Sequence, residues 1–394
     1  MDMPSEKVIA QRRRHTRFSN IIGADLQSPR LYHPRVITMS VIGTITISVI
    51  QLNGLYKAWP NILSICQTLF FIPLILQIFS RIINRYGLND EAINRELLER
   101  LMQFNRNHEN NLIYRLVLLK KLNFYYSFFN ATSLGYFIVI HMPFIGIIAS
   151  AAFSGTYQLM APIYLPFVDA TKLWGFIVNA IVQLLLTEIT FFALTTLDFQ
   201  FMFYSYHIAS MFDILSMKFT EFGNKLTDHP RSNFKYIVRK FIIRVHKDPA
   251  ERSNKEMLIH LIKDYYKITK YTSLLFKEMK IPVFMTITSG GFALCLSALT
   301  MLSNSTIIGA LGIFFYMTQI ATSCILVTFV IHQYEMFLNR IYKFPWYLLS
   351  NSDQKIFLQY LQICQNFDDF ELPMIGTVDM ELFTTVVNTD FNSF

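Results

Sequence analysis

Residues 281–334 read IPVFMTITSGGFALCLSALTMLSNSTIIGALGIFFYMTQIATSCILVTFVIHQY and contain no Asp, Glu, Lys or Arg. This stretch is more than twice as long as the ~20 apolar residues that one helix needs to cross about 30 Å of hydrocarbon. The polar tetrapeptide Ser303-Asn304-Ser305-Thr306 lies near its middle, and such residues mark a loop between periodic segments. We therefore predict two membrane-spanning helices joined by a short turn.

Other apolar blocks predict further spans on both sides of this pair. Residues 36–56, 58–80 and 122–168 also lack Asp, Glu, Lys and Arg, and residues 173–197 contain one charge, Glu188. A more polar seventh span is expected over 373–394, which holds Asp379, Glu381 and Asp390. With 53% hydrophobic and 16% charged residues, the composition excludes an ordinary soluble domain.

The basic residues set the expected orientation of these spans. Of the 35 Lys and Arg, all but Lys57 and Lys172 lie in alternate gaps between the apolar blocks. Because positive charge near span ends stays on the cytoplasmic side, the N-terminus is expected inside and the C-terminus outside. The net charge of +8 follows from this topology and from attraction to anionic lipid, so no nucleic-acid partner is expected.

The predicted fold is all-α: a polytopic membrane protein with seven transmembrane helices, some of them extending into a cytoplasmic anchor domain. Its expected segments are a cytoplasmic N-terminus (1–35), helices 1–4 (36–198) with a cytoplasmic helical segment (81–121), a cytoplasmic extension (199–280), helices 5–6 (281–334), an anchor segment (335–372) and helix 7 (373–394).

One cytoplasmic helix has a clear start. Asp248 is a capping residue, and Pro249 suits the first helical position. Beyond it an apolar stripe recurs at helical spacing, made of Leu258, Leu261, Tyr265, Ile268 and Leu275. The stripe predicts a helix reaching roughly 45 Å below the membrane. Either it packs subunits together, or it bundles only within one chain.

Catalytic patterns are not found in the sequence. It has no glycine-rich phosphate loop, nucleophile elbow or paired metal-ligand spacing, so we expect no enzyme activity, no cofactor and no metal site. The four cysteines are interpreted as packing residues. His141 is interpreted as a hydrogen-bonded structural residue in the third span, and Glu188 has no obvious partner. Asn304, in the sequon Asn304-Ser305-Thr306, is the expected glycosylation site because its loop is predicted outside.

Several short motifs lie in the last part of the chain. They are Gln333-Tyr334-Glu335, Ile341-Tyr342-Lys343-Phe344-Pro345-Trp346-Tyr347, Leu358-Gln359, Leu361-Gln362 and Glu381-Leu382-Phe383-Thr384-Thr385-Val386-Val387-Asn388-Thr389. Asp198 with His207, Phe212 and Leu215 forms another. Together with the length and the inverted topology, they resemble the insect odorant receptors, and the resemblance covers the whole chain.

The resemblance implies an odorant-gated, non-selective cation channel. Such subunits assemble as heterotetramers with a co-receptor in the plasma membrane of sensory-neuron dendrites, and the seventh helix lines the pore. Candidate pore residues are Thr385, Asn388, Thr389 and Asp390. Independently, polar residues in a span must face water or protein, and a ring of carboxylates attracts cations. The family's run after Thr389 is longer and more apolar than here, so either partner subunits complete the constriction or this copy is truncated.

The resemblance also places a small volatile odorant in the outer half of the bundle. The candidate ligand-binding residues are Phe70, Phe144, Ile145, Trp174, Ile177, Tyr316 and Gln319. Such a site is mostly apolar and aromatic, with few polar groups to fix the orientation of the ligand. Membrane lipid is the other expected partner.

Three alternatives remain at this point. A gustatory-type receptor channel shares the fold, but its tail signature is not found here. A metabotropic seven-helix receptor requires the opposite charge pattern and also Asp-Arg-Tyr and Asn-Pro-x-x-Tyr motifs, which are absent from the sequence. A transporter predicts repeated halves and broken helices, and the sequence has no internal repeat.

Overall fold

The computed structural model describes residues 110–154, 171–228, 249–302, 306–367 and 370–392, together with 48–49, 51–56, 59, 61–69, 72–73, 75–77, 80, 103–104, 106–108, 159, 165 and 168–169. The first two predicted spans, 36–56 and 58–80, are therefore described only in pieces. Asp248, the predicted cap, and Asn304, the predicted glycosylation site, lie outside the described residues.

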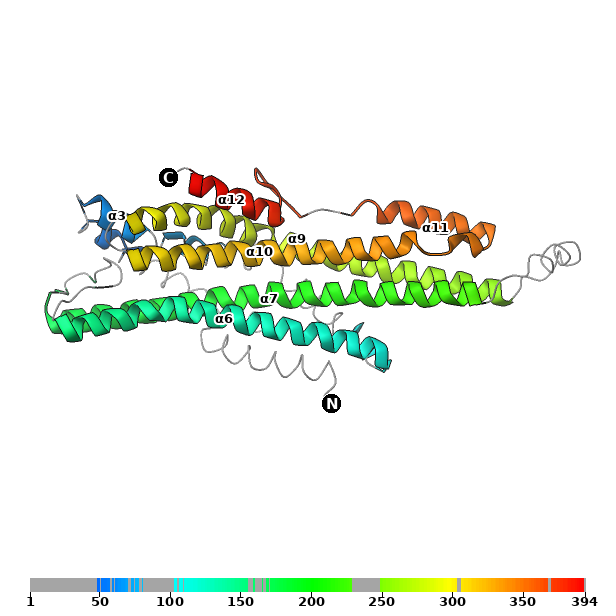
Figure 1. The fold of residues 1–394 in the computed structure, drawn as a ribbon, viewed down its shortest axis with the longest axis horizontal. Helices are drawn as coiled ribbons and strands as arrows, with labels where there is room; N and C mark the ends of the chain where they lie inside the picture. Colours follow the sequence, from blue (N-terminus) through cyan, green and yellow to red (C-terminus); the bar gives the residue numbers. More distant parts are fainter. Residues whose placement is uncertain are drawn as a thin grey trace, which may run out of the picture.

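Four long helices lie side by side along the length of the molecule (Figure 1). They are α6 (Leu112–Ser154), α7 (Leu173–Asp228), α9 (Pro249–Leu302) and α10 (Thr306–Tyr342). The end where α6 and α9 finish is also the end where α7 and α10 begin. With 54 residues, α9 is about 80 Å long at ~1.5 Å per residue, much longer than the ~30 Å of bilayer hydrocarbon. Such a helix is long enough to span a membrane and to continue well beyond it.

The shorter elements flank this bundle. The helix α3 (Ile62–Leu69) packs on α9, and α11 (Asn351–Cys364) packs on α9 at the opposite end of the molecule, which we call the α11 end (Figure 1). The 3-10 turn η1 (Trp346–Leu348) precedes α11. The last helix, α12 (Met380–Asn392), lies along α10 and α9.

Two described helical stretches are long and apolar enough to cross a membrane, judged by length and composition alone. They are Asn254–Met301 in α9 and Gly309–Tyr342 in α10. Leu173–Leu185, at the start of α7, is a shorter apolar stretch. The all-α class is confirmed in outline. That the chain has seven spans, and on which side of the membrane each terminus lies, stay predictions.

The seventh predicted segment begins differently from the expectation. Instead of a helix from Pro373, two antiparallel two-residue strands, β1 (Glu371–Leu372) and β2 (Gly376–Thr377), form a hairpin. Met374 and Gly376 have φ of 66° and 92°, the left-handed values that let a chain reverse direction tightly. The helix starts only at Met380, where the backbone N–H of Leu382 donates to Oδ1 of Asp379 at 2.8 Å. That side chain satisfies one of the free N–H groups of the first turn.

Aromatic packing dominates the core at the α11 end. The rings of Phe219 and Tyr360 are stacked with centroids 5.8 Å apart, and those of Tyr265 and Phe337 are stacked at 5.7 Å. These contacts join α7 to α11 and α9 to α10. The predicted stripe on α9 is buried here, from Leu258 at 0% exposed to Tyr265 at 1%. Packing within the chain buries this stripe, and a role of the helix in packing subunits together stays a prediction.

Glycines set the close approach of α9 and α10. A Cβ added to Gly309 would lie 2.6 Å from the backbone nitrogen of Met301, which is closer than real contacts allow. A Cβ on Gly290 would lie 3.1 Å from Cδ1 of Ile320, whereas one on Gly291 would have no atom within 4 Å. Small residues let membrane helices approach closely, and in the pair Gly290-Gly291 the first residue has this role.

Candidate ligand-binding and pore residues

Two of the predicted ligand-binding residues lie together inside the bundle. Tyr316 and Gln319, one turn apart on α10, are 0% and 2% exposed. On the same helix the ring of Phe315 lies 5.3 Å from that of Tyr136 on α6. Neither Nε2 nor Oε1 of Gln319 has a hydrogen-bond partner. The structure thus places one unpaired amide among aromatic side chains.

The other predicted ligand-binding residues do not join this pair among the described residues. Ile145 on α6 and Trp174 on α7 are 61% and 78% exposed, and Ile177 is half-buried. Phe144 is part of α6, but its side chain is outside what the structure describes, as is the whole of Phe70. For these five residues the ligand-binding role stays a prediction.

Glu188 has a partner, contrary to the expectation from sequence. Its Oε1 lies 2.5 Å from Nε2 of His141, so that the two residues link α7 to α6. Nδ1 of His141 lies 2.7 Å from the carbonyl oxygen of Phe137. Since a carbonyl oxygen can only accept, Nδ1 of His141 is the donor in this contact. His141 is hydrogen-bonded as expected. The spacing of residues could not reveal its partner, because positions 141 and 188 lie on different helices.

The predicted pore residues all lie on α12. Thr385 is exposed, and its hydroxyl donates to the carbonyl oxygen of Glu381 at 2.9 Å. The side chains of Asn388, Thr389 and Asp390 are outside the described part of the structure. Along the same helix, Leu382, Phe383 and Val386 pack against the core, whereas Glu381, Thr384 and Thr385 are exposed.

The start of α12 separates two acidic residues. Asp379 precedes the helix and caps it, whereas Glu381 belongs to the first turn of α12. An acidic residue there interacts favourably with the positive end of the helix dipole. Helix α12 therefore presents one apolar face to its own chain and one polar face away from it.

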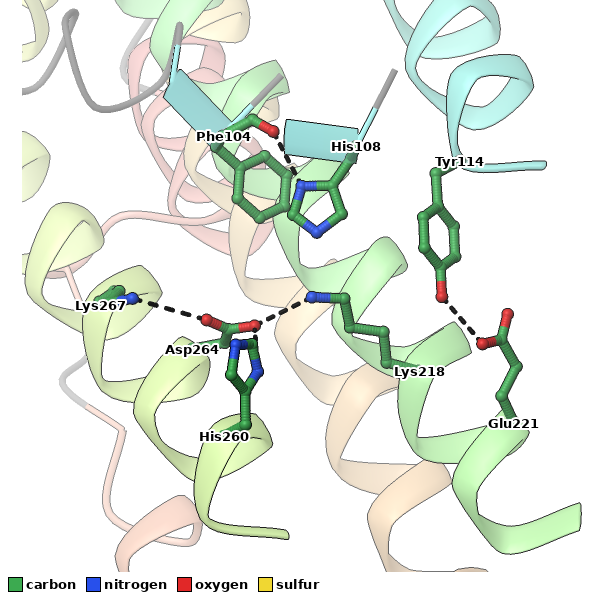
Figure 2. Close-up of polar contacts among 8 residues, drawn as sticks. All are labelled: Phe104, His108, Tyr114, Lys218, Glu221, His260, Asp264 and Lys267. Carbon is green, nitrogen blue, oxygen red and sulfur yellow. Dashed lines mark hydrogen bonds and ion pairs between the residues drawn. The ribbon is translucent and has the colours of Figure 1, made fainter. Parts of the chain in front are cut away.

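A charged cluster joins α7 and α9 near the α11 end (Figure 2). Nζ of Lys218 lies 2.9 Å from Oδ2 of Asp264, with His260 Nδ1 at 3.4 Å and Lys267 Nζ at 3.7 Å from the same carboxylate. Sequence reasoning missed this cluster. Its one signal was the i, i+3 and i, i+4 spacing of Lys267 and His260 from Asp264, which is common on solvated helices.

Two further contacts lie beside this cluster in Figure 2. The hydroxyl of Tyr114 on α6 donates to Oε2 of Glu221 on α7 at 3.0 Å, and Nδ1 of His108 lies 2.8 Å from the carbonyl oxygen of Phe104. Burial raises the pKa of Tyr114 to about 12, and the bond to Glu221 adds to this shift. Burial also lowers the pKa of His108. Tyr114 therefore stays a hydrogen-bond donor throughout the physiological range.

Within the described residues, no group of three His, Cys, Asp or Glu side chains could hold a metal ion. All four cysteines, Cys66, Cys295, Cys324 and Cys364, are free thiols.

These features describe an α-helical bundle in which two described stretches are long and apolar enough to cross a membrane. A family model described as "7tm Odorant receptor" matches residues 60–391. The chain belongs to this odorant receptor family, and the resemblance stated from the sequence is confirmed.

Solved structures show the same fold. The insect olfactory receptor OR5 from Machilis hrabei matches with a TM-score of 0.72 and 13% sequence identity, over 99% of this chain and 97% of that chain. The same receptor in complex with eugenol matches with a TM-score of 0.73 and 13% identity, over 99% and 98% of the two chains. None of the curated proteins matches this chain significantly.

Proposed function

We propose that this odorant receptor is the ligand-binding subunit of a non-selective cation channel, assembled with a co-receptor as a heterotetramer in the plasma membrane of sensory-neuron dendrites. The observation that carries the proposal is the two-sided α12. Apolar side chains of α12 pack against the core, and Glu381, Thr384 and Thr385 are exposed. A polar helix face beside membrane spans requires water or protein next to it, and a pore supplies water.

In this proposal the exposed face of α12 lines the pore. Thr385, Asn388 and Thr389 follow Glu381 at four, seven and eight residues, which places them on the same side of the helix. Asp390 is proposed to attract cations near the outer mouth. The hairpin at 371–377 separates α12 from the rest of the chain, so α12 can shift without unfolding the long helices.

The odorant is proposed to bind in the outer half of the bundle. Tyr316 and Gln319 contribute from α10, Phe144 and Ile145 from α6, Trp174 and Ile177 from α7, and Phe70 from the second span. That a similar fold was solved in complex with eugenol supports a small organic ligand here. Asn304 is the proposed glycosylation site, and the surrounding lipid is the other partner.

Whole-cell recording tests this function. The chain is expressed with and without an insect odorant co-receptor, its surface level is measured by labelling, and pooled volatiles are applied. We expect a rapid cation current that needs the co-receptor and persists when G proteins are blocked. A response that disappears on G-protein blockade contradicts the channel proposal and favours a metabotropic receptor. A response to non-volatile tastants alone favours the gustatory-type alternative.

Variants of α12 test the pore assignment. Asp390→Asn is expected to lower the permeability of divalent relative to monovalent cations, because a carboxylate at the mouth concentrates divalent ions most strongly. Ser393→Ala, close by at the end of the chain, is the uncharged control. Equal permeability ratios in the wild type and Asp390→Asn contradict the role of Asp390.

A further inference from the structure

We infer that the side-chain amide of Gln319 selects the chemical class of the odorant: this receptor prefers volatiles with a hydroxyl or carbonyl group to hydrocarbons of the same shape. The inference rests on the proposed function, because it places the ligand beside α10. It goes further by assigning one polar contact to one residue and by naming the functional group that this residue recognises.

The amide is fully buried and unused. Gln319 is 2% exposed, and neither Nε2 nor Oε1 has a hydrogen-bond partner. A glutamine amide carries two donor hydrogens and an acceptor oxygen, and the large majority of buried polar side chains have a partner. In a membrane span no bulk solvent compensates for the missing bonds. A buried amide of this kind is therefore poised for a partner that arrives from outside the chain.

Other buried amides in the described part of the chain show the contrast. Asn179 on α7 donates from Nδ2 to the carbonyl oxygen of Gly175 at 2.8 Å and accepts at Oδ1 from the N–H of Leu165 at 2.7 Å. Gln77 donates from Nε2 to Oγ of Ser289 at 3.1 Å. Nε2 of Gln51 and Oε1 of Gln77 also lack a partner, but among the described residues Gln319 is the one buried amide that lacks a partner at both atoms.

Neighbouring hydroxyl groups on α10 do not hydrogen-bond to the side-chain amide of Gln319. Oγ of Ser323 donates to the backbone carbonyl oxygen of Gln319 at 3.2 Å, and Oγ1 of Thr318 donates to that of Phe314 at 2.7 Å. Each hydroxyl is thus committed to its own helix backbone. The amide stays available although polar groups lie within a turn of it.

The surroundings of the amide match what a small apolar ligand requires. Tyr316 lies one turn away and is fully buried, Phe315 contacts Tyr136 across to α6, and Ile320 faces Gly290 of α9. Small-molecule sites are mostly apolar and aromatic with a few polar groups that fix orientation. A hydroxyl would donate to Oε1 of Gln319, whereas a carbonyl oxygen would accept from Nε2.

The cost of leaving the Gln319 amide unpaired explains why oxygenated volatiles are preferred to hydrocarbons. A hydrocarbon that displaces any water beside Gln319 leaves the amide unpaired in an apolar environment, whereas an alcohol or ketone pairs it. A site built to hydrogen-bond a ligand rejects the analogue that lacks the group more strongly than an apolar pocket rejects an extra methylene. We expect about tenfold or more between matched ligands.

The test compares matched volatiles on the wild type and on Gln319→Leu, which keeps the size of the side chain and removes its hydrogen bonds. The probes are straight-chain alcohols, methyl ketones and alkanes of equal carbon number, and 2-phenylethanol against ethylbenzene. Half-maximal concentrations are read from currents with the co-receptor. Gln319→Leu is expected to weaken the oxygenated probes about tenfold and to leave the hydrocarbons unchanged or improved.

Two further variants keep the test decisive. Thr318→Val removes a hydroxyl from the next position on α10 and is expected to leave the preference unchanged. Gln319→Met replaces the leucine variant if that variant does not reach the cell surface. If both classes of probe shift alike in the Gln319 variants, or if no oxygenated probe acts on the wild type, the inference is wrong.

Ligand-induced thermal stabilisation of the purified receptor separates this inference from the channel proposal. If the wild type passes no current but is stabilised by an oxygenated probe, and Gln319→Leu loses that stabilisation, the channel proposal fails and the inference holds. If current appears and the variant keeps the same ligand preference, the channel proposal holds and the inference fails. The second outcome, current with an unchanged ligand preference, is also expected if the Gln319 amide hydrogen-bonds only to trapped water.

Discussion

Lys218 on α7 and Asp264 on α9 form an ion pair across the α11 end of the bundle, with Nζ and Oδ2 2.9 Å apart. Their side chains are 16% and 14% exposed, whereas that of Lys267, on the other side of the carboxylate, is 61% exposed. The pair therefore lies largely inside the helix packing, while Lys267 adds to it from the surface. Substitutions at Asp264 and at Lys267 are therefore expected to change the stability of the receptor by different amounts.

Replacing Asp264 by Asn is expected to destabilise the receptor, because it leaves the ammonium group of Lys218 largely buried without its counter-ion. A loss of about 2 kcal/mol is expected, below the range for fully buried pairs since some solvent remains. Thermal unfolding in detergent measures it. Lys267→Met is the control, and an exposed pair contributes only about 0–1 kcal/mol. Equal losses in the two variants would contradict the role assigned to Lys218.

Gly309→Ala is expected to disrupt the packing of the start of α10 against the end of α9. The added methyl group would lie 2.6 Å from the backbone nitrogen of Met301 and 2.7 Å from the carbonyl oxygen of Ser297. Backbone atoms cannot move aside as a flexible side chain can, so a loss at or above the usual ~1–3 kcal/mol of overpacking is expected. The amount of folded receptor after size-exclusion chromatography reports the effect.

Gly291→Ala is the matched control for this prediction, because its methyl group would meet no atom within 4 Å. Alanine is a better helix former than glycine by roughly 1 kcal/mol. The variant is therefore expected to be neutral or slightly stabilised. If Gly309→Ala behaves in the same way, the close approach at Gly309 is not needed for folding.

His207 is expected to make the receptor less stable in mild acid. It lies in the part of α7 predicted beyond the fourth span, and burial lowers its pKa to about 4. Between this value and the unfolded value near 6.5, the unfolded chain binds a proton that the folded chain does not. Stability is therefore fully present above about pH 6.5 and falls as the pH drops toward 4, by about 2 kcal/mol near pH 5.

The pH dependence of the unfolding temperature tests this sign. His207→Gln keeps a neutral polar side chain that does not titrate, and it should flatten the curve between pH 7 and pH 5. His260→Gln, on the exposed side of the cluster at Asp264, serves as the comparison. An unchanged slope in His207→Gln would show that other groups cause the acid sensitivity.

Cys364 is expected to resist alkylation in the folded receptor. It is 0% exposed, and burial raises the pKa of its thiol to about 11. Since the thiolate is the reactive form, iodoacetamide should modify Cys364 only after unfolding. Ile363→Cys introduces a thiol at a neighbouring position that is 42% exposed. Peptide mass spectrometry follows both sites, and rapid labelling of Cys364 in the folded state would refute the prediction.

The sequence predicted those parts of the fold that depend on local patterns. Within the uncharged stretch at 281–334, α9 ends at Leu302 and α10 begins at Thr306, Pro249 begins α9, and the stripe from Leu258 to Leu275 is buried. Each of these follows from composition or helical periodicity along one segment. The motifs of the last third also identified the family correctly.

Contacts between residues on different helices could not be predicted from patterns along one segment. Glu188 and His141 pair across α6 and α7, and the register between separate helices leaves no trace in spacing. The ligand-binding residues were chosen by expected depth in the membrane. That criterion finds the level of a residue but not the side of the helix it occupies, so it selected both the buried Gln319 and the exposed Trp174. The hairpin at 371–377 was missed because its strands have two residues each.

The unbroken length of α9 also constrains how such chains can vary. Its 54 residues pack against α3 near one end and α11 near the other. One inserted residue in the middle would turn everything beyond it by about 100°, and one of the two packed ends would then present its polar side to the core. Among relatives, we expect insertions and deletions to occur in the segments between helices, such as 229–248. We expect natural recombination between family members to have its breakpoints there and not within α9.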